Sequence, residues 1–198
     1  TIFVSKVMTT VRNNLLEGGL LVVAVLFLFL GDLRAGLIVA SAIPLAMLIA
    51  FTGMMQAGLS GNLMSLGAID FGLLVDGSVV MIDNILRRLA DKPVRNRDER
   101  LATVLAAGRE VLRPMTLAVS IIILVYVPIL ALTGIEGKMF RPMAFTVIMA
   151  LAGSLLLAVT VTPLLSYWFV RTGANRQETL VIRGLRGAYA PLLKWAVA

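Results

Sequence analysis

The chain has 198 residues, of which 59% are hydrophobic, with a mean hydropathy of +0.95 and a net charge of +7. Soluble domains are usually about 45–50% apolar, so this composition indicates a polytopic membrane protein and excludes an ordinary soluble domain. The lack of cysteine excludes disulfides and thiolate metal sites, and the lack of histidine removes the commonest transition-metal ligand.

The first two apolar segments predict membrane-crossing helices over residues 15–31 and 37–55, since a span needs about 17–25 residues. Residues 1–14 are too polar to cross, but their apolar positions recur at helical spacing and predict an amphipathic lead-in. The chain begins without a signal-peptide pattern, so we interpret it as part of a longer protein. Pro44 predicts a kink in the second span.

The third predicted span, residues 63–86, contains three carboxylates: Asp70, Asp76 and Asp83. Residues 87–114 follow, with eight basic residues against four acidic ones, which predicts a cytoplasmic loop. Good helix formers over 98–112 predict a short surface helix within this loop. We expect no nucleic-acid binding by its arginines, because no aromatic stacking residue is interleaved with them.

The last two spans are predicted over residues 115–132, which include Pro128, and 143–170, which are long enough to tilt. Residues 133–142 between them predict a short outside loop. Tyr167 and Trp168 form an interfacial aromatic pair near the end of the fifth span. The tail, residues 171–198, carries five basic residues and predicts an amphipathic segment on the inside.

The distribution of basic residues supports a topology in which successive connecting segments lie on alternate sides of the membrane. Arg34, the eight in the loop and the five in the tail fall inside, against four outside, namely Lys6, Arg12, Lys138 and Arg141. Since cytoplasmic loops carry the excess of Lys and Arg, the predicted topology places Thr1 outside and the C-terminal end inside.

The three aspartates are the candidate site, because a carboxylate at the bilayer centre costs a few kcal/mol. On a helix, Asp76 and Asp83 lie within roughly 20° of one stripe and about 10 Å apart, whereas Asp70 lies about 120° away. Burial and neighbouring like charges raise the pKa of such acids, so they can bind and release protons during transport.

Two other roles of the three aspartates fit the sequence less well than a proton relay. The aspartates can instead pair statically with basic residues, but no basic residue lies deep in the five predicted spans. Intramembrane aspartyl proteolysis requires two aspartates facing each other from two helices, and here all three lie on one. The triplet Asp70-Phe71-Gly72 matches the kinase metal-binding motif, but a Gly-rich loop and an HRD motif are missing.

A family resemblance is carried by NLMSLGAIDFGLLVDGSVVMIDNILRRL, residues 62–89. This segment resembles the fourth transmembrane helix of the heavy-metal efflux branch of the resistance-nodulation-division (RND) transporters, of the Czc and Cnr type. Residues 14–45 and 49–62 are similar to the second and third helices of these proteins. Residues 108–147 are similar to the fifth helix and the start of the sixth, so the resemblance covers nearly the whole chain.

The resemblance implies an all-α polytopic transmembrane bundle, with five spans of an RND-type six-helix repeat. It implies a proton-driven antiporter of the bacterial inner membrane, assembled as a homotrimer with a periplasmic adaptor and an outer-membrane channel, and no cofactor. Residues 1–14 are then a periplasmic lead-in, 15–86 helices two to four, 87–114 a cytoplasmic loop, 115–170 helices five and six, and 171–198 a cytoplasmic tail. Asp70, Asp76 and Asp83 match the proton-translocating acids.

Two departures from the family pattern bear on the site. Asp83-Asn84 stands where the family usually has Glu-Asn, and Ser78 stands where it usually has Ala. In the family that the chain resembles, copper and silver pumps generally lack the first aspartate of the pattern. The resemblance therefore implies that the substrate of a protein with Asp70 is zinc, cobalt, nickel or cadmium rather than copper or silver. The resemblance places the periplasmic cation site in domains that this chain does not contain. Alternative functions are an RND exporter of drugs or lipids with the same relay, and a non-transporting membrane bundle.

Overall fold

The computed structural model describes residues 17–59, 71–91 and 96–170. These residues form five helices and no strand, which confirms the predicted all-α class. The helices are Glu17–Leu30, which carries no label, Leu33–Gln56 (α2), Phe71–Asp91 (α4), Arg97–Leu130 (α5) and Gly134–Phe169 (α6). The predicted lead-in over 1–14 and the predicted tail over 171–198 lie outside the described residues.

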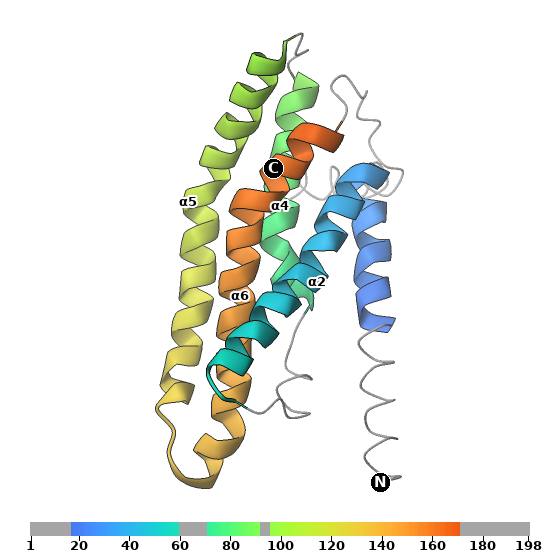
Figure 1. Ribbon diagram of the computed structural model, residues 1–198. Coiled ribbons are helices and arrows are strands. Elements are labelled where there is room, and N and C mark those ends of the chain that lie inside the picture. Colours follow the sequence, from blue (N-terminus) through green and yellow to red (C-terminus); the bar gives the residue numbers. More distant parts are fainter. Residues whose placement is uncertain (1–16, 60–70, 92–95, 171–198) are drawn as a thin grey trace, which may run out of the picture.

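Helix α6 lies at the centre of the bundle, because α2, α4 and α5 all pack against it (Figure 1). α5 runs antiparallel beside α6, α4 contacts both of them, and α2 crosses the bundle obliquely. The helix Glu17–Leu30 joins α2 through a tight turn at Gly31, whose φ of 63° is accessible to glycine at little cost. α4 therefore has neighbours on one side and an open side facing away from α6.

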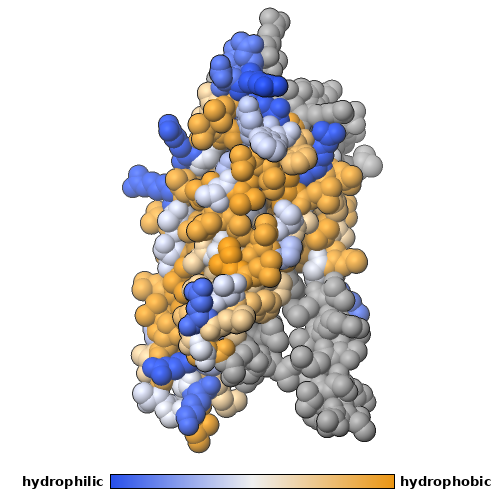
Figure 2. Space-filling model, viewed as in Figure 1, coloured by the Kyte–Doolittle hydropathy of each residue, from blue (hydrophilic) through white to orange (hydrophobic). Residues whose placement is uncertain are grey.

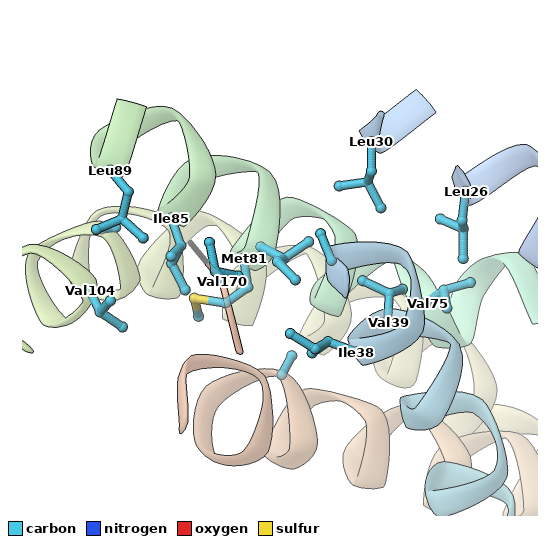
Figure 3. Close-up of a cluster of buried hydrophobic side chains, with 14 of the residues drawn as sticks. Leu26, Leu30, Ile38, Val39, Val75, Met81, Ile85, Leu89, Val104 and Val170 are labelled. Carbon is cyan, nitrogen blue, oxygen red and sulfur yellow. The ribbon is translucent and has the colours of Figure 1, made fainter. Parts of the chain in front are cut away.

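The largest buried side chains gather where α4 meets its neighbours (Figure 3). Met81, Ile82 and Ile85 of α4 are at most 1% exposed. The other helices contribute the surrounding residues: Leu26, Leu30, Ile38, Val39, Val104 and Val170. Because lipid tails are as apolar as these side chains, close packing rather than expulsion of water has to hold the helices together within a membrane.

Close packing is provided by small residues that recur every fourth position along α6. All are at most 4% exposed, and they are Thr146, Ala150, Ser154, Ala158, Thr162 and Ser166. Residues four apart share one face of a helix, so they form a single ridge of small side chains. A Cβ added at Gly77 of α4 would lie 3.3 Å from Cβ of Ala158, which shows how closely α4 approaches this ridge.

Helix α5 continues through residues that the sequence assigned to separate elements. The predicted surface helix over 98–112 and the predicted fourth span are one helix, with Pro114 inside it. Proline removes the hydrogen bond to the carbonyl four residues earlier, which belongs to Glu110. Glu110 is exposed, so water can satisfy that carbonyl and the helix continues.

The prediction of a loop over residues 133–142 is wrong, because α6 already begins at Gly134. Gly137 has a packing role near the start of α6, because a Cβ there would collide with the carbonyl oxygen of Leu132. Arg141 donates a hydrogen bond from Nε to the carbonyl of Leu130 at 2.7 Å, which ties the start of α6 to the end of α5. The connection between the two helices is therefore only three residues long.

Three of the described helices, α2, α5 and α6, are long and apolar enough to cross a membrane. The helix Glu17–Leu30 is apolar but shorter, and α4 is more polar because it carries three aspartates and two arginines. Hydrophilic residues lie mainly toward the two ends of the bundle, and hydrophobic residues cover most of the face between them (Figure 2). This distribution matches a bundle whose middle lies in hydrocarbon.

Candidate functional site

Helix α4 presents Asp76 and Asp83 on its open side. The opposite face of the helix is buried against α5 and α6 through Leu74, Val75, Ser78, Met81, Ile82 and Ile85. Asp76 and Val80 are exposed and Asp83 is half-buried. The positions 76, 80 and 83 follow helical spacing, so the two aspartates share a face, as the sequence predicted. Asp70, the third predicted acid, lies outside the described residues.

The described helices leave the side chain of Asp76 exposed. The reason is the position of the neighbours, because α5 and α6 pack on the other face of α4. Burial of Asp76 would therefore require polypeptide beyond the described residues.

Asp83 lines a groove of about 480 Å³ between α4, α5 and the helix Glu17–Leu30. The other lining residues are mostly apolar: Phe29, Leu30, Val79, Val80, Asn84 and Val111. A volume of this size is many times the ~30 Å³ that one water molecule occupies, so the groove can hold several waters beside the carboxylate. Chains of water are one route by which a proton reaches a side chain.

A polar clamp joins α4 to α5 one residue beyond Asp83. The Asn84 side-chain amide donates to the carbonyl of Ala107 at 2.9 Å and to Oε2 of Glu110 at 3.1 Å. Arg88 donates to the same oxygen from Nη2 at 2.9 Å and from Nε at 3.2 Å. The hydrogen bond from Asn84, followed by the bond and the charge of Arg88, lowers the pKa of Glu110 below its usual 4.5.

Hydroxyl groups hold the buried face of α4 against α6. Ser154 donates to the carbonyl of Leu74, and Thr162 donates to Oγ of Ser78 at 3.3 Å. Ser78 and Thr162 are at most 1% exposed, so these contacts lie inside the bundle. Ser78, which stands where the family usually has Ala, therefore has a hydrogen-bond partner on α6.

Two arginines converge on the C-terminal end of α6. Arg100 of α5 donates to the carbonyls of Ser166 and Val170 and lies 5.3 Å from the ring centre of Tyr167. Arg34 of α2 donates from Nη1 to the carbonyl of Phe169 at 3.1 Å. Positive groups are favourable at the negative end of a helix dipole. The starts of α2 and α5 therefore lie at the same end of the bundle as the end of α6.

Sequence reasoning missed both the clamp and the arginine contacts. Asn84 and Arg88 lie on α4 and Glu110 lies on α5, and no spacing along the chain relates the two helices. The only signal in the sequence is the i, i+4 relation of Asn84 and Arg88, which places them on one face.

The described residues contain no group of three acidic side chains, histidines or cysteines arranged to hold a metal ion.

The sequence profile of the AcrB/AcrD/AcrF family matches residues 1–198. The chain is 48% identical over 203 residues to the cobalt-zinc-cadmium resistance protein CzcA of Cupriavidus metallidurans, which covers 100% of this chain and 19% of CzcA. It is 49% identical over 199 residues to protein HelA of Legionella pneumophila, covering 98% of this chain and 19% of HelA. The nickel and cobalt resistance protein CnrA of C. metallidurans is 45% identical over 194 residues, covering 96% of this chain and 18% of CnrA.

Among solved structures, a heavy metal efflux pump in crystal form I has a TM-score of 0.71 and 43% identity. The match covers 81% of this chain and 15% of that one. These findings confirm the resemblance to heavy-metal efflux proteins of the RND type that the sequence predicted. This chain spans about a fifth of the length of the curated relatives described above.

Proposed function

The chain belongs to the AcrB/AcrD/AcrF family, and from this membership we propose that it forms the transmembrane proton-relay portion of a proton-driven efflux pump for divalent heavy-metal cations. Its homologues are transporters, so the chain is part of a transport protein rather than of an enzyme. The proposal assigns proton binding to Asp70, Asp76 and Asp83. The cation is the substrate of the complete protein.

The observation that carries the proposal is the placement of two acids on the open face of α4, a helix packed among apolar ones. A carboxylate in a membrane is unfavourable by a few kcal/mol, and such residues usually have a role in transport. Asp76 is exposed on the face of α4 that points away from α5 and α6. Asp83 lines a groove with room for water.

A relay on α4 can use the membrane potential directly. Moving one charge across about 100 mV releases about 2.3 kcal/mol, enough to shift a two-state equilibrium by more than tenfold. Binding of a proton removes the charge of an aspartate and with it the unfavourable contact with hydrocarbon. The change in charge then favours a different position of α4 relative to its neighbours.

The proposed substrates are zinc, cobalt, nickel or cadmium ions, in keeping with the names of the relatives, the cobalt-zinc-cadmium resistance protein CzcA and the nickel and cobalt resistance protein CnrA. We propose that the complete protein acts in the bacterial inner membrane as a homotrimer, together with a periplasmic adaptor and an outer-membrane channel. Its cation site would then lie in periplasmic domains outside this chain.

The test is metal resistance of cells that express the full-length protein. Asp70→Asn, Asp76→Asn and Asp83→Asn are expected to lower proton-coupled export by about 10²-fold or more, as for loss of other proton-transfer groups. Asp98→Asn is the matched control, because Asp98 is an exposed acid in the first turn of α5. Full export by Asp70→Asn and Asp76→Asn would contradict the relay.

The alternative of a drug or lipid exporter makes a different prediction for the same cells. Such an exporter protects against dyes or detergents but not against zinc, cobalt, nickel or cadmium. A non-transporting bundle tolerates all three neutral substitutions. Growth on each class of compound therefore distinguishes the three functions.

A further inference from the structure

A second groove lies between the start of α2 and the end of α6, away from the aspartates. It has a volume of about 230 Å³. Apolar side chains form most of its walls, with Arg34 and Ser41 as the polar members: Leu37, Ile38, Leu165 and Phe169. The volume is several times the ~30 Å³ share of one water molecule, but the walls offer water few partners. An apolar ligand fits this lining better than water does.

The residues around this groove are of the types found where a membrane meets water. Trp168, next to Phe169, is 70% exposed, and tryptophan is enriched at the level of lipid headgroups. Leu37 is 56% exposed and begins the apolar stretch of α2. Arg34 lies one turn earlier, in the first turn of α2 close to its N-cap residue Asp32. An apolar slot therefore opens beside an arginine at headgroup level.

Arg34 has capacity for a ligand. Its Nη1 donates to the carbonyl of Phe169, which uses one of the five N–H groups of a guanidinium. Asp32 accepts a hydrogen bond from the backbone N–H of Arg34, and among the described residues the two side chains form no ion pair. Arg100 adds a second guanidinium at the same end of α6. The charge at the mouth therefore favours an anion.

We propose that this groove binds an anionic phospholipid, with the phosphate at Arg34 and the first part of an acyl chain between α2 and α6. Arginine matches phosphate geometry through parallel N–H groups. The apolar walls of the groove replace the contacts that the acyl chain makes with neighbouring lipids in the bilayer. The proposal does not depend on the proton relay, because none of the three aspartates lines this groove.

The experiment measures lipid binding to the purified, delipidated full-length protein by native mass spectrometry, with phosphatidylglycerol and phosphatidylcholine as probes. The wild-type protein is expected to retain phosphatidylglycerol more tightly than phosphatidylcholine. Arg34→Gln is expected to weaken phosphatidylglycerol binding at this site about tenfold, the effect of losing a charged hydrogen bond. Leu37→Asn, which leaves Arg34 in place, should also weaken it.

Arg141→Gln is the matched control. Arg141 also donates from its guanidinium to a helix-end carbonyl, that of Leu130, but at the other end of the bundle. This variant should bind phosphatidylglycerol as the wild type does. The proposal is overturned if either Arg34→Gln or Leu37→Asn binds like the wild type, if Arg141→Gln loses binding equally, or if the two lipids bind alike. Such results would mean that another part of the protein fills the groove or that binding is unspecific.

Discussion

At the scale of single residues, the two described aspartates of α4 have different surroundings. Asp76 is exposed on the open face, whereas Asp83 lines a groove next to the clamp of Asn84, Arg88 and Glu110. The sequence predicted their shared face, because that follows from helix geometry alone. It did not predict the clamp, because the clamp depends on which face of α5 turns toward α4.

The clamp makes a prediction about pH. The folded protein lowers the pKa of Glu110, so the ionised form stabilises the α4–α5 contact. This contribution is fully present above the unfolded pKa, near 4.5, and is lost as the pH falls through the lower folded pKa. The full-length protein should therefore have a higher thermal midpoint than its Glu110→Gln variant at neutral pH.

Acidification should make this difference shrink. Thermal unfolding of both proteins is measured from neutral pH down to the range below 4.5 in which Glu110 becomes protonated. Glu136→Gln is a suitable control, since Glu136 is an exposed acid in the first turn of α6. A difference that stays constant or grows on acidification would show that the charge of Glu110 does not stabilise the contact.

Arg100 yields a second prediction at this scale. It donates to two carbonyls at the end of α6 and lies over Tyr167, and it is half-buried. Arg100→Ala should lower the free energy of unfolding by about 2–3 kcal/mol, the range for hydrogen bonds to charged groups plus a cation–π contact. Arg97→Ala, an exposed arginine one turn earlier, should change it by less than about 0.5 kcal/mol. Denaturant unfolding of the full-length protein measures both, and equal effects would contradict the assignment.

At the scale of elements, α4 is positioned by how closely it approaches α6. Gly77 and Ser78 face Ala158 and Thr162, so small groups meet small groups along this contact. Glycines and serines near the aspartates permit close approach of helices in lipid, but the sequence pattern does not indicate which helix approaches. That choice depends on contacts between residues about 80 positions apart, which periodicity does not encode.

Substitution of Gly77 tests this contact. A Cβ there would already lie 3.3 Å from Ala158 and from Sδ of Met115, so Gly77→Leu forces α4 away from the bundle. We expect a loss of about 1–3 kcal/mol or more, as for overpacked cores, and loss of metal export. Gly19→Leu is the control, because a Cβ at Gly19 has no neighbour within 4 Å. Similar unfolding curves and export for the two variants would contradict the close approach.

At the scale of the whole molecule, the sequence predicted a membrane bundle because hydropathy and basic residues are properties of composition and order. It placed two boundaries wrongly, at Pro114 and at residues 133–142, because proline and glycine also occur inside membrane helices. Packing decides such positions: Gly137 lies against the carbonyl of Leu132, and that contact is invisible until α5 and α6 are placed together.

The arrangement of the helix ends makes the last prediction. Arg34 and Arg100 both contact the end of α6, so the starts of α2 and α5 lie at one end of the bundle and the start of α6 lies at the other. The excess of basic residues predicts that the first end is cytoplasmic. This chain has no cysteine, so single cysteines can be introduced into it for labelling, against a full-length background freed of any others.

Leu101→Cys at the start of α5 and Ile135→Cys at the start of α6 are suitable sites, because both residues are exposed. In intact spheroplasts, a membrane-impermeant maleimide should label Ile135→Cys at once and Leu101→Cys only after permeabilisation. Leu33→Cys, exposed at the start of α2, should behave like Leu101→Cys, since the two lie at the same end.

Labelling of Leu33→Cys and Leu101→Cys from opposite sides would contradict the arrangement of the helices, and labelling of both from outside would reverse the topology. In the reversed case the cluster of basic residues would lie in the periplasm, and protons entering from there would reach Asp83 before Asp76.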